Sequence, residues 1–124
     1  MNYAIVDIET TGGHASSHGI TEISVFVHDG KRVIKHFETL INPQQLIPKF
    51  ITSLTGIDND MVAEAPVFDE IADTLFDILD TNIFIAHNVN FDYSFLKHQF
   101  KQSGYDLTAK KLCTVRLGRK VFPG

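Results

Sequence analysis

The chain is poor in the features that mark secreted and membrane proteins. It holds one cysteine, Cys113, so no disulfide can form within the chain, and a reducing compartment is expected. No apolar run is long enough to cross a bilayer, and the N-terminus lacks the basic stretch of a signal peptide. The sequence therefore predicts a cytoplasmic protein without a membrane span. No nucleophile motif surrounds Cys113, so we expect a core residue there rather than a catalytic thiol.

Positive charge is also scarce, and it is distributed unevenly. The formal net charge is −4, from 11 Lys and Arg against 15 Asp and Glu, which by itself argues against a nucleic-acid partner. Eight acidic residues lie between Asp58 and Asp80, where Lys and Arg are absent, whereas seven of the 11 basic residues lie from Lys97 onward. This basic C-terminal part could follow a phosphate backbone, or it could be an ordinary solvated surface.

Hydrophobic periodicity predicts one α/β domain with a mixed sheet covered by helices. The expected strands cover residues 3–9, 19–28, 32–41, 82–86 and 112–117. Asp29-Gly30 indicates a hairpin, so the second and third strands should pair antiparallel. One helix should span 48–57 and end at Gly56, and another should have Pro66 in its first turn. A third is expected between a cap at Asn90 and Gly104.

The most informative segment is the apolar run over residues 3–9, which ends in two carboxylates, Asp7 and Glu9. Because side chains alternate along a strand, both carboxylates lie on the same face. There they repel each other and are costly to bury unless a cation lies between them. Mg²⁺ takes carboxylate oxygens as ligands and is the simplest such cation. The alternative is that both residues are solvated and close the strand before a turn at Gly12.

A third carboxylate, Asp92, follows the predicted strand 82–86 and lies in the first turn of the next helix. An Asp at that position could simply complement the helix dipole. In mixed sheets, however, the chemistry gathers at the carboxyl ends of the strands. If strands 3–9 and 82–86 are parallel neighbours, then Asp7, Glu9 and Asp92 converge at one edge of the sheet.

Taken together, these segments resemble the DEDD family of 3′–5′ exonucleases, the DnaQ-like group that includes the proofreading subunit of bacterial DNA polymerase III. Asp7-Ile8-Glu9-Thr10-Thr11-Gly12 is similar to the first motif of that family. His87-Asn88-Val89-Asn90-Phe91-Asp92, with Phe95-Leu96, is similar to the second. The resemblance extends to the connecting segment 47–66 and to the tail 113–124, so it covers the whole chain.

The resemblance implies a ribonuclease H-like fold and hydrolysis of a phosphodiester at a free 3′ end by two metal ions, Mg²⁺ or Mn²⁺. It implies that Asp7, Glu9 and Asp92 are the catalytic and metal-binding residues. The residues expected to lie against the terminal nucleotide are Ile8, Thr10, Thr11, Gly12, Asn88 and Phe91. The expected partners are single-stranded 3′ ends of DNA or RNA and a polymerase or further domain. Proofreading, repair and RNA processing all stay open.

The third motif of the family, a general-base His followed by a fourth metal-binding Asp, has no counterpart among the 124 residues. None of the six histidines replaces it, since four precede the second motif, His87 belongs to that motif, and His98 projects from a largely different side of the same helix as Asp92. We therefore expect residues 1–124 to be a C-terminally truncated exonuclease domain that lacks its last helices. Hydrolysis should be weak or absent, and one apolar sheet face should be open to self-association.

Two functions follow from this expectation. The first is a metal-dependent 3′–5′ exonuclease. The alternative is a catalytically incomplete exonuclease fold that binds nucleic acid or a polymerase. A structural Ca²⁺ site is a third possibility, but such sites usually recruit more oxygen ligands from a dedicated loop.

Overall fold

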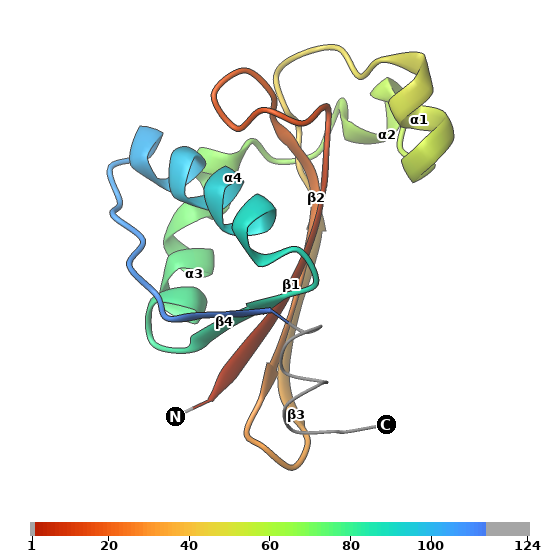
Figure 1. Cartoon of the computed structure of the whole chain (residues 1–124). Coiled ribbons are helices and arrows are strands. Elements are labelled where there is room, and N and C mark those ends of the chain that lie inside the picture. Colours follow the sequence, from red (N-terminus) through yellow and green to blue (C-terminus); the bar gives the residue numbers. More distant parts are fainter. Residues whose placement is uncertain (1, 114–124) are drawn as a thin grey trace.

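A five-stranded mixed sheet forms the centre of the computed structural model, which describes residues 2–113 (Figure 1). The strands are β1 (Tyr3–Thr10), β2 (Ile20–His28), β3 (Val33–Leu40), β4 (Ile83–Ala86) and β5 (Lys111–Cys113). Their order is β3-β2-β1-β4-β5. The first three strands form an antiparallel meander, and β4 runs parallel to both β1 and β5. The parallel pairing of β1 with β4, the condition for the three carboxylates to converge, is therefore met.

Four helices accompany the sheet in the described part of the chain: α1 (Lys49–Thr55), α2 (Asn59–Val62), α3 (Phe68–Asp80) and α4 (Val89–Gln102). α3 and α4 lie side by side on one face of the sheet, whereas α1 and α2 lie beyond the end of β1 and β2 (Figure 1). Gly56 ends α1 in the left-handed conformation, at φ 79°, which glycine adopts without steric cost. No described helix combines the length and the apolar character needed to cross a membrane.

The main core lies between the sheet and the α3–α4 layer. α3 buries its apolar face there while its Asp side chains remain exposed, as the helical spacing predicts. Phe100 of α4 is fully buried and meets Phe68 and Phe76 edge-on, with ring centroids 5.0 and 5.4 Å apart. A second, smaller core under α1 and α2 comprises Ile47, Ile51, Ile57 and Val62.

The other face of the sheet carries the opposite set of alternating side chains. On β1 these include Ile5, Asp7 and Glu9, whereas Ala4, Val6 and Ile8 turn toward the helices and are buried. Phe26 of β2 and Ile34 of β3 are 39% and 48% exposed, although Phe26 stacks on the ring of His36 at 4.1 Å. Among the described residues, α3 and α4 pack only against the buried face. The carboxylates therefore lie on the more open face.

Two helix starts differ from the sequence prediction. α4 begins at Val89, with Asn88 rather than Asn90 at its cap, because the chain turns into the helix almost directly after β4. α3 begins at Phe68, so Pro66 lies outside the helix, while the Glu70 carboxylate accepts a hydrogen bond from the backbone N–H of Val67 at 3.1 Å.

One helix was not predicted at all. α2 is a single turn whose Asp58 cap accepts a hydrogen bond from the backbone N–H of Met61 at 2.8 Å. A turn this short has no apolar period of its own, so only the capping residue marks it in the sequence.

Several expectations fall on residues outside the described range. The predicted strand 112–117 is described only as far as Cys113, and the surroundings of the Cys113 side chain are not described. The same holds for the motif-like tail from residue 114 onward and for its basic residues Arg116, Arg119 and Lys120.

Candidate active site

The centre of the candidate site is formed where β1 continues past the end of β4. The parallel pairing stops at Ile5 opposite Ile85, so Asp7 and Glu9 lie beyond the last paired residue of that ladder. β4 ends at Ala86, and the chain turns at once into α4, which carries Asp92 in its first turn. This turn brings Asp92 back toward β1.

Asp92 is the most buried of the three carboxylates, with 6% of its surface exposed. Burial, and after it the neighbouring charges of Asp7 and Glu9, raise the pKa of Asp92 to about 7. The backbone N–H groups of Asp92 itself and of Ile8 act in the opposite direction and lower this pKa. Asp92 therefore belongs to the same electrostatic cluster as the two β1 carboxylates.

A further carboxylate, that of Glu22, lies beside Glu9. It was not among the predicted site residues. Glu22 of β2 is the direct antiparallel partner of Glu9 across the ladder. The pKa of Glu9 is raised by burial, then by Asp7 and Glu22, and the pKa of Glu22 is raised by burial, then by Glu38 and Asp7. Only the register between β1 and β2 reveals this neighbour, because a cross-strand pair has no fixed spacing in the sequence.

No Lys or Arg within residues 2–113 neutralises these carboxylates. The ion pairs of the described residues join His36 to Glu38 and Lys97 to Asp106, and neither pair reaches Asp7, Glu9 or Asp92. A cluster of carboxylate oxygens without a protein counter-ion has the donor chemistry that Mg²⁺ and Mn²⁺ prefer. The described side chains nevertheless include no group of three or more that is already arranged to hold one metal ion.

The turn after β1 is held by its own threonine hydroxyls. Thr10 Oγ1 donates to the carbonyl oxygen of Gly12 at 2.7 Å. Thr11 Oγ1 donates to Gln45 Oε1 and accepts from the N–H of Gly19 at 3.1 Å, and Thr11 is only 1% exposed. The two threonine side chains therefore fix the shape of the turn. Because their hydroxyls point inward to these partners, the turn exposes mainly its backbone to solvent.

The imidazole of His18 lies directly against Gly12. A methyl group added at Gly12 would lie 2.5 Å from the ring atoms of His18, closer than any normal contact. His18 is itself held in place, since its Nδ1 accepts from the N–H of His14 at 3.0 Å and the two rings stack.

The remaining predicted substrate residues lie near the carboxylates in different environments. The side chain of Ile8 is buried on the helix-covered face, so only its backbone faces the carboxylates. Asn88 is exposed, and its carbonyl oxygen accepts from the N–H of Asp92 at 3.2 Å. Phe91 is half-buried beside Phe95, at a centroid distance of 4.9 Å. Contacts of these residues with a nucleotide stay a prediction.

Comparison with known proteins identifies the family of this chain. The model of a family described as Exonuclease matches residues 4–124. The chain belongs to this exonuclease family. The predicted resemblance to DnaQ-like exonucleases is thereby confirmed.

Curated relatives align with this chain over nearly the full length of the chain. The chain is 38% identical over 126 residues to a protein named 3′–5′ exonuclease DinG from Bacillus subtilis. It is 38% identical over 120 residues to a PolC-type DNA polymerase III from Caldanaerobacter subterraneus. These alignments cover 100% and 97% of this chain, but only 14% and 9% of the relatives, so the chain spans a small part of either protein.

Solved structures of exonucleases share the fold. Exonuclease I in its apo form superimposes with a TM-score of 0.85 over 98% of this chain and 30% of its own, at 16% identity. Exonuclease X, in complex with 5′ overhanging duplex DNA, superimposes with a TM-score of 0.73 over 98% of this chain and 65% of its own, at 25% identity. The predicted ribonuclease H-like α/β fold is thereby confirmed.

Proposed function

We propose that residues 1–124 carry the carboxylate site of a metal-dependent 3′–5′ exonuclease, which removes nucleotides from the 3′ end of DNA or RNA by hydrolysis. The observation that supports this proposal most is the meeting of Asp7, Glu9 and the buried Asp92 at one edge of the sheet, without a Lys or Arg counter-ion among residues 2–113. Exonuclease-family membership supports the same reading.

The three carboxylates would hold one or two divalent cations, Mg²⁺ or Mn²⁺. Such ions, when bound, activate a water molecule and stabilise the leaving oxygen of a phosphodiester. The chain's own contribution is to keep Asp7 and Glu9 on one face of β1 and to hold Asp92 against that strand through the first turn of α4. Burial of Asp92 makes cation binding and proton loss at this residue strongly coupled.

The 3′-terminal nucleotide would lie against the turn at Thr10, Thr11 and Gly12 and against Asn88 and Phe91. The turn is suited to this role because its hydroxyls are already engaged and its conformation is fixed before a ligand arrives. Asn88, with an exposed side chain, and Phe91, with a half-buried ring, lie at the start of α4 just before Asp92. A free nucleic-acid end is therefore the proposed partner, and a polymerase or a further domain of a longer protein is a second.

A binding function without hydrolysis is the second candidate. It is favoured by the finding that no three of the described acidic, His or Cys side chains form a ready-made cage for one metal ion. In that case the same surface would hold a nucleic-acid end or a polymerase without cutting.

Hydrolysis of a single-stranded oligonucleotide labelled at its 5′ end, in Mn²⁺, separates the two candidates. The exonuclease predicts a ladder that shortens from the 3′ end and disappears with EDTA or in Asp7→Asn. Glu38→Gln is the matched control, since it also removes one carboxylate from the open face but leaves Asp7, Glu9 and Asp92 unchanged. No ladder, together with oligonucleotide binding that neither EDTA nor Asp7→Asn weakens, would reject a metal site at these carboxylates and support the binding function.

A further inference from the structure

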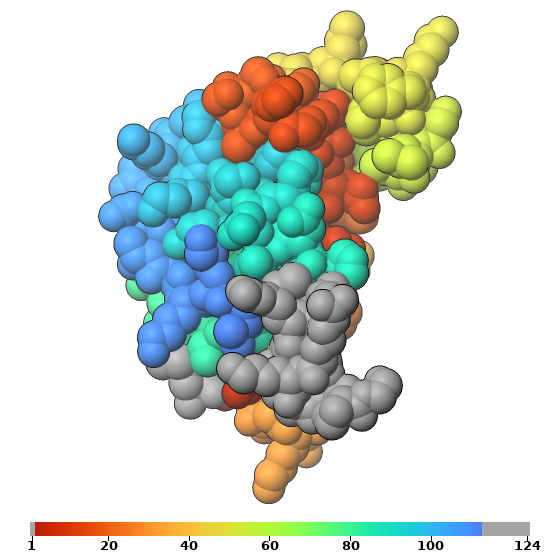
Figure 2. Space-filling view, in the orientation of Figure 1, coloured from red at the N-terminus to blue at the C-terminus, as the bar shows by residue number. Residues whose placement is uncertain are grey.

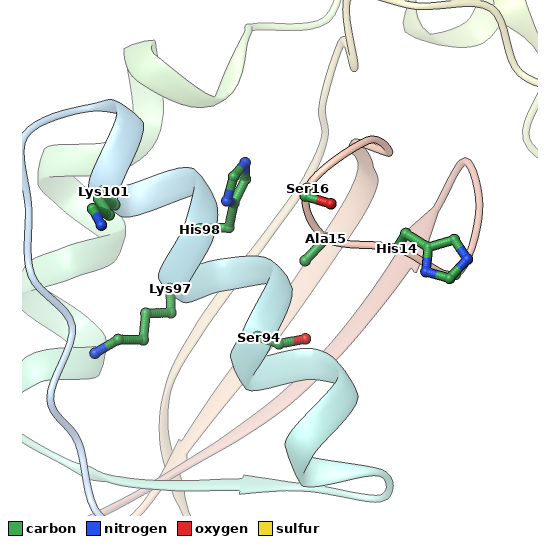
Figure 3. A pocket seen from close by; sticks show the side chains of 8 residues that line it. His14, Ala15, Ser16, Ser94, Lys97, His98 and Lys101 are labelled. Carbon is green, nitrogen blue, oxygen red and sulfur yellow. The ribbon is translucent and has the colours of Figure 1, made fainter.

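A groove of about 470 Å³ lies beside the candidate active site, between the β1–β2 loop and α4. Its walls are loop residues 13–16 and four side chains of α4: Ser94, Lys97, His98 and Lys101. In the space-filling view the loop lies directly against α4 (Figure 2). Figure 3 shows Ser94 and His98 directed from the helix toward Ala15 and Ser16 of the loop.

The charge of this groove is opposite to that of the whole chain. No Asp or Glu occurs between Thr11 and Gly19 or between Tyr93 and Tyr105, which are the two segments that form the walls. The lining contains two Lys, two His and two Ser, and every one of these side chains can donate a hydrogen bond. In a chain with a net charge of −4, a groove of donors without a single carboxylate is suited to an anion.

The two lysines of the groove differ in how far they are already engaged. Lys97 Nζ donates to the carbonyl oxygen of Leu107 at 3.0 Å and lies 3.5 Å from Asp106 Oδ1. Lys101 is exposed and forms no ion pair with any residue in the range 2–113. Lys101 and His98 are therefore the cationic or potentially cationic groups of α4 that a ligand could engage without breaking a contact of the fold.

The position of the groove connects it to the carboxylates. Gly13, at one end of the groove, follows the turn at Gly12 directly. Ser94 and Lys101 lie on the side of α4 turned away from Asp92, since residues two or nine apart on a helix do not share a face. A bound strand would therefore reach the carboxylates by way of the turn at Gly12 and Gly13. From Ser94 to Lys101 the helix rises about 10 Å at 1.5 Å per residue. A groove of this length accommodates a short stretch of an extended single strand.

We propose that this groove binds the phosphodiester backbone of the strand whose 3′ end lies at Asp7, Glu9 and Asp92. The strand would continue from the carboxylates along α4, with Lys101 and His98 contacting phosphate oxygens and the hydroxyls of Ser16 and Ser94 donating to the same backbone. The proposal rests on the proposed function for the position of the strand end, but binding can be measured without hydrolysis.

The test is binding of a labelled single-stranded DNA 12-mer to the full chain in EDTA, followed by fluorescence anisotropy over a series of salt concentrations. Lys101→Gln should weaken binding several-fold and should reduce the slope of log K against log salt by about 0.7, the contribution of one phosphate on a single strand. The double variant Lys101→Gln with His98→Gln should weaken binding further. The control, Lys31→Gln, removes the same charge from the β2–β3 hairpin at the opposite end of the sheet (Figure 1) and should leave the slope unchanged.

The outcomes separate the groove from the active site. Equal slopes for Lys101→Gln and the native chain, equal losses in Lys101→Gln and Lys31→Gln, or no binding of the 12-mer by the native chain would overturn the groove proposal. Slopes that change as expected would support the groove proposal even when no ladder forms, because binding in EDTA does not depend on hydrolysis. A normal ladder with unchanged slopes would support the exonuclease and overturn the groove proposal.

Discussion

The hydroxyl of Thr11 donates a hydrogen bond to the side-chain oxygen of Gln45, 34 residues away in the sequence. This bond ties the turn after the β1 carboxylates to the connection between β3 and α1. The amide nitrogen of Gln45 reaches the same loop a second time, at the carbonyl oxygen of Ser17, 3.4 Å away. The β1–β2 loop is thus fixed both by hydrogen bonds within the loop and by hydrogen bonds to Gln45.

Replacing Thr11 by Val should destabilise the protein by about 1–3 kcal/mol, because the N–H of Gly19 and the side chain of Gln45 would lose a buried partner. Thermal unfolding measures the change. Thr21→Val is the matched control with the opposite expectation, since Thr21 Oγ1 is buried and has no hydrogen-bond partner among residues 2–113, so its removal should be neutral or stabilising. Equal losses in both variants would contradict the role given to Thr11.

Gly12→Ala should destabilise the turn, because the new methyl group would lie 2.5 Å from the His18 ring. Overpacking of this kind costs about 1–3 kcal/mol. Gly13→Ala is the control one residue on, where an added methyl group has no neighbour within 4 Å. We expect the Gly12→Ala defect in melting temperature to be partly restored when His18 is replaced by Ala. Without that rescue, the contact between Gly12 and His18 would not be the cause.

The stability of the metal-free protein should fall as the pH rises toward neutrality, and Asp92 should be the main reason. The pKa of Asp92 in the folded state, about 7, lies above its ordinary value of 3.8, so the folded protein binds more protons than the unfolded chain between these values. The stabilisation is complete below the unfolded pKa and is lost as the pH rises through about 7.

In EDTA we expect the melting temperature to fall by about 4 °C or more between about pH 5 and pH 8, which corresponds to roughly 1 kcal/mol in a domain of this size. Asp92→Asn should remove most of this slope, because the amide does not titrate. Added Mg²⁺ should oppose the fall, since a cation favours the ionised carboxylate. A slope that persists unchanged in Asp92→Asn would show that other groups cause it.

Glu22→Gln should lower the pKa of Glu9 toward its ordinary value, because one of the charges that raises it is removed. NMR titration of the side-chain carboxyl groups measures this directly. Glu64→Gln is the control, since Glu64 is exposed in the segment after α2 and is not among the charges that raise the pKa of Glu9. An unchanged pKa of Glu9 in Glu22→Gln would mean that the cross-strand pair does not interact.

Local patterns in the sequence were sufficient to predict the strands and the shared face of Asp7 and Glu9. The alternation along β1 fixes Asp7 and Glu9 on one face whatever the rest of the chain does, because successive side chains of a strand must point to opposite sides. The hairpin at Asp29-Gly30 likewise depends on local turn chemistry, and the Asp29 carboxylate accepts hydrogen bonds from the N–H groups of Lys31 and Arg32 at 2.8 and 2.9 Å. The cap of α4 was misplaced by two residues because Asn88 and Asn90 are both suitable capping residues.

The tertiary structure alone decided what lies beside these local elements. Asp92 reaches Asp7 because β4 pairs parallel to β1, a choice among strand orders that no local pattern specifies. Glu22 faces Glu9 because of the β1–β2 register, and the groove exists because the β1–β2 loop lies against α4. Proximity between distant segments depends on how the whole core packs, whereas side-chain alternation and turn geometry depend only on neighbouring residues.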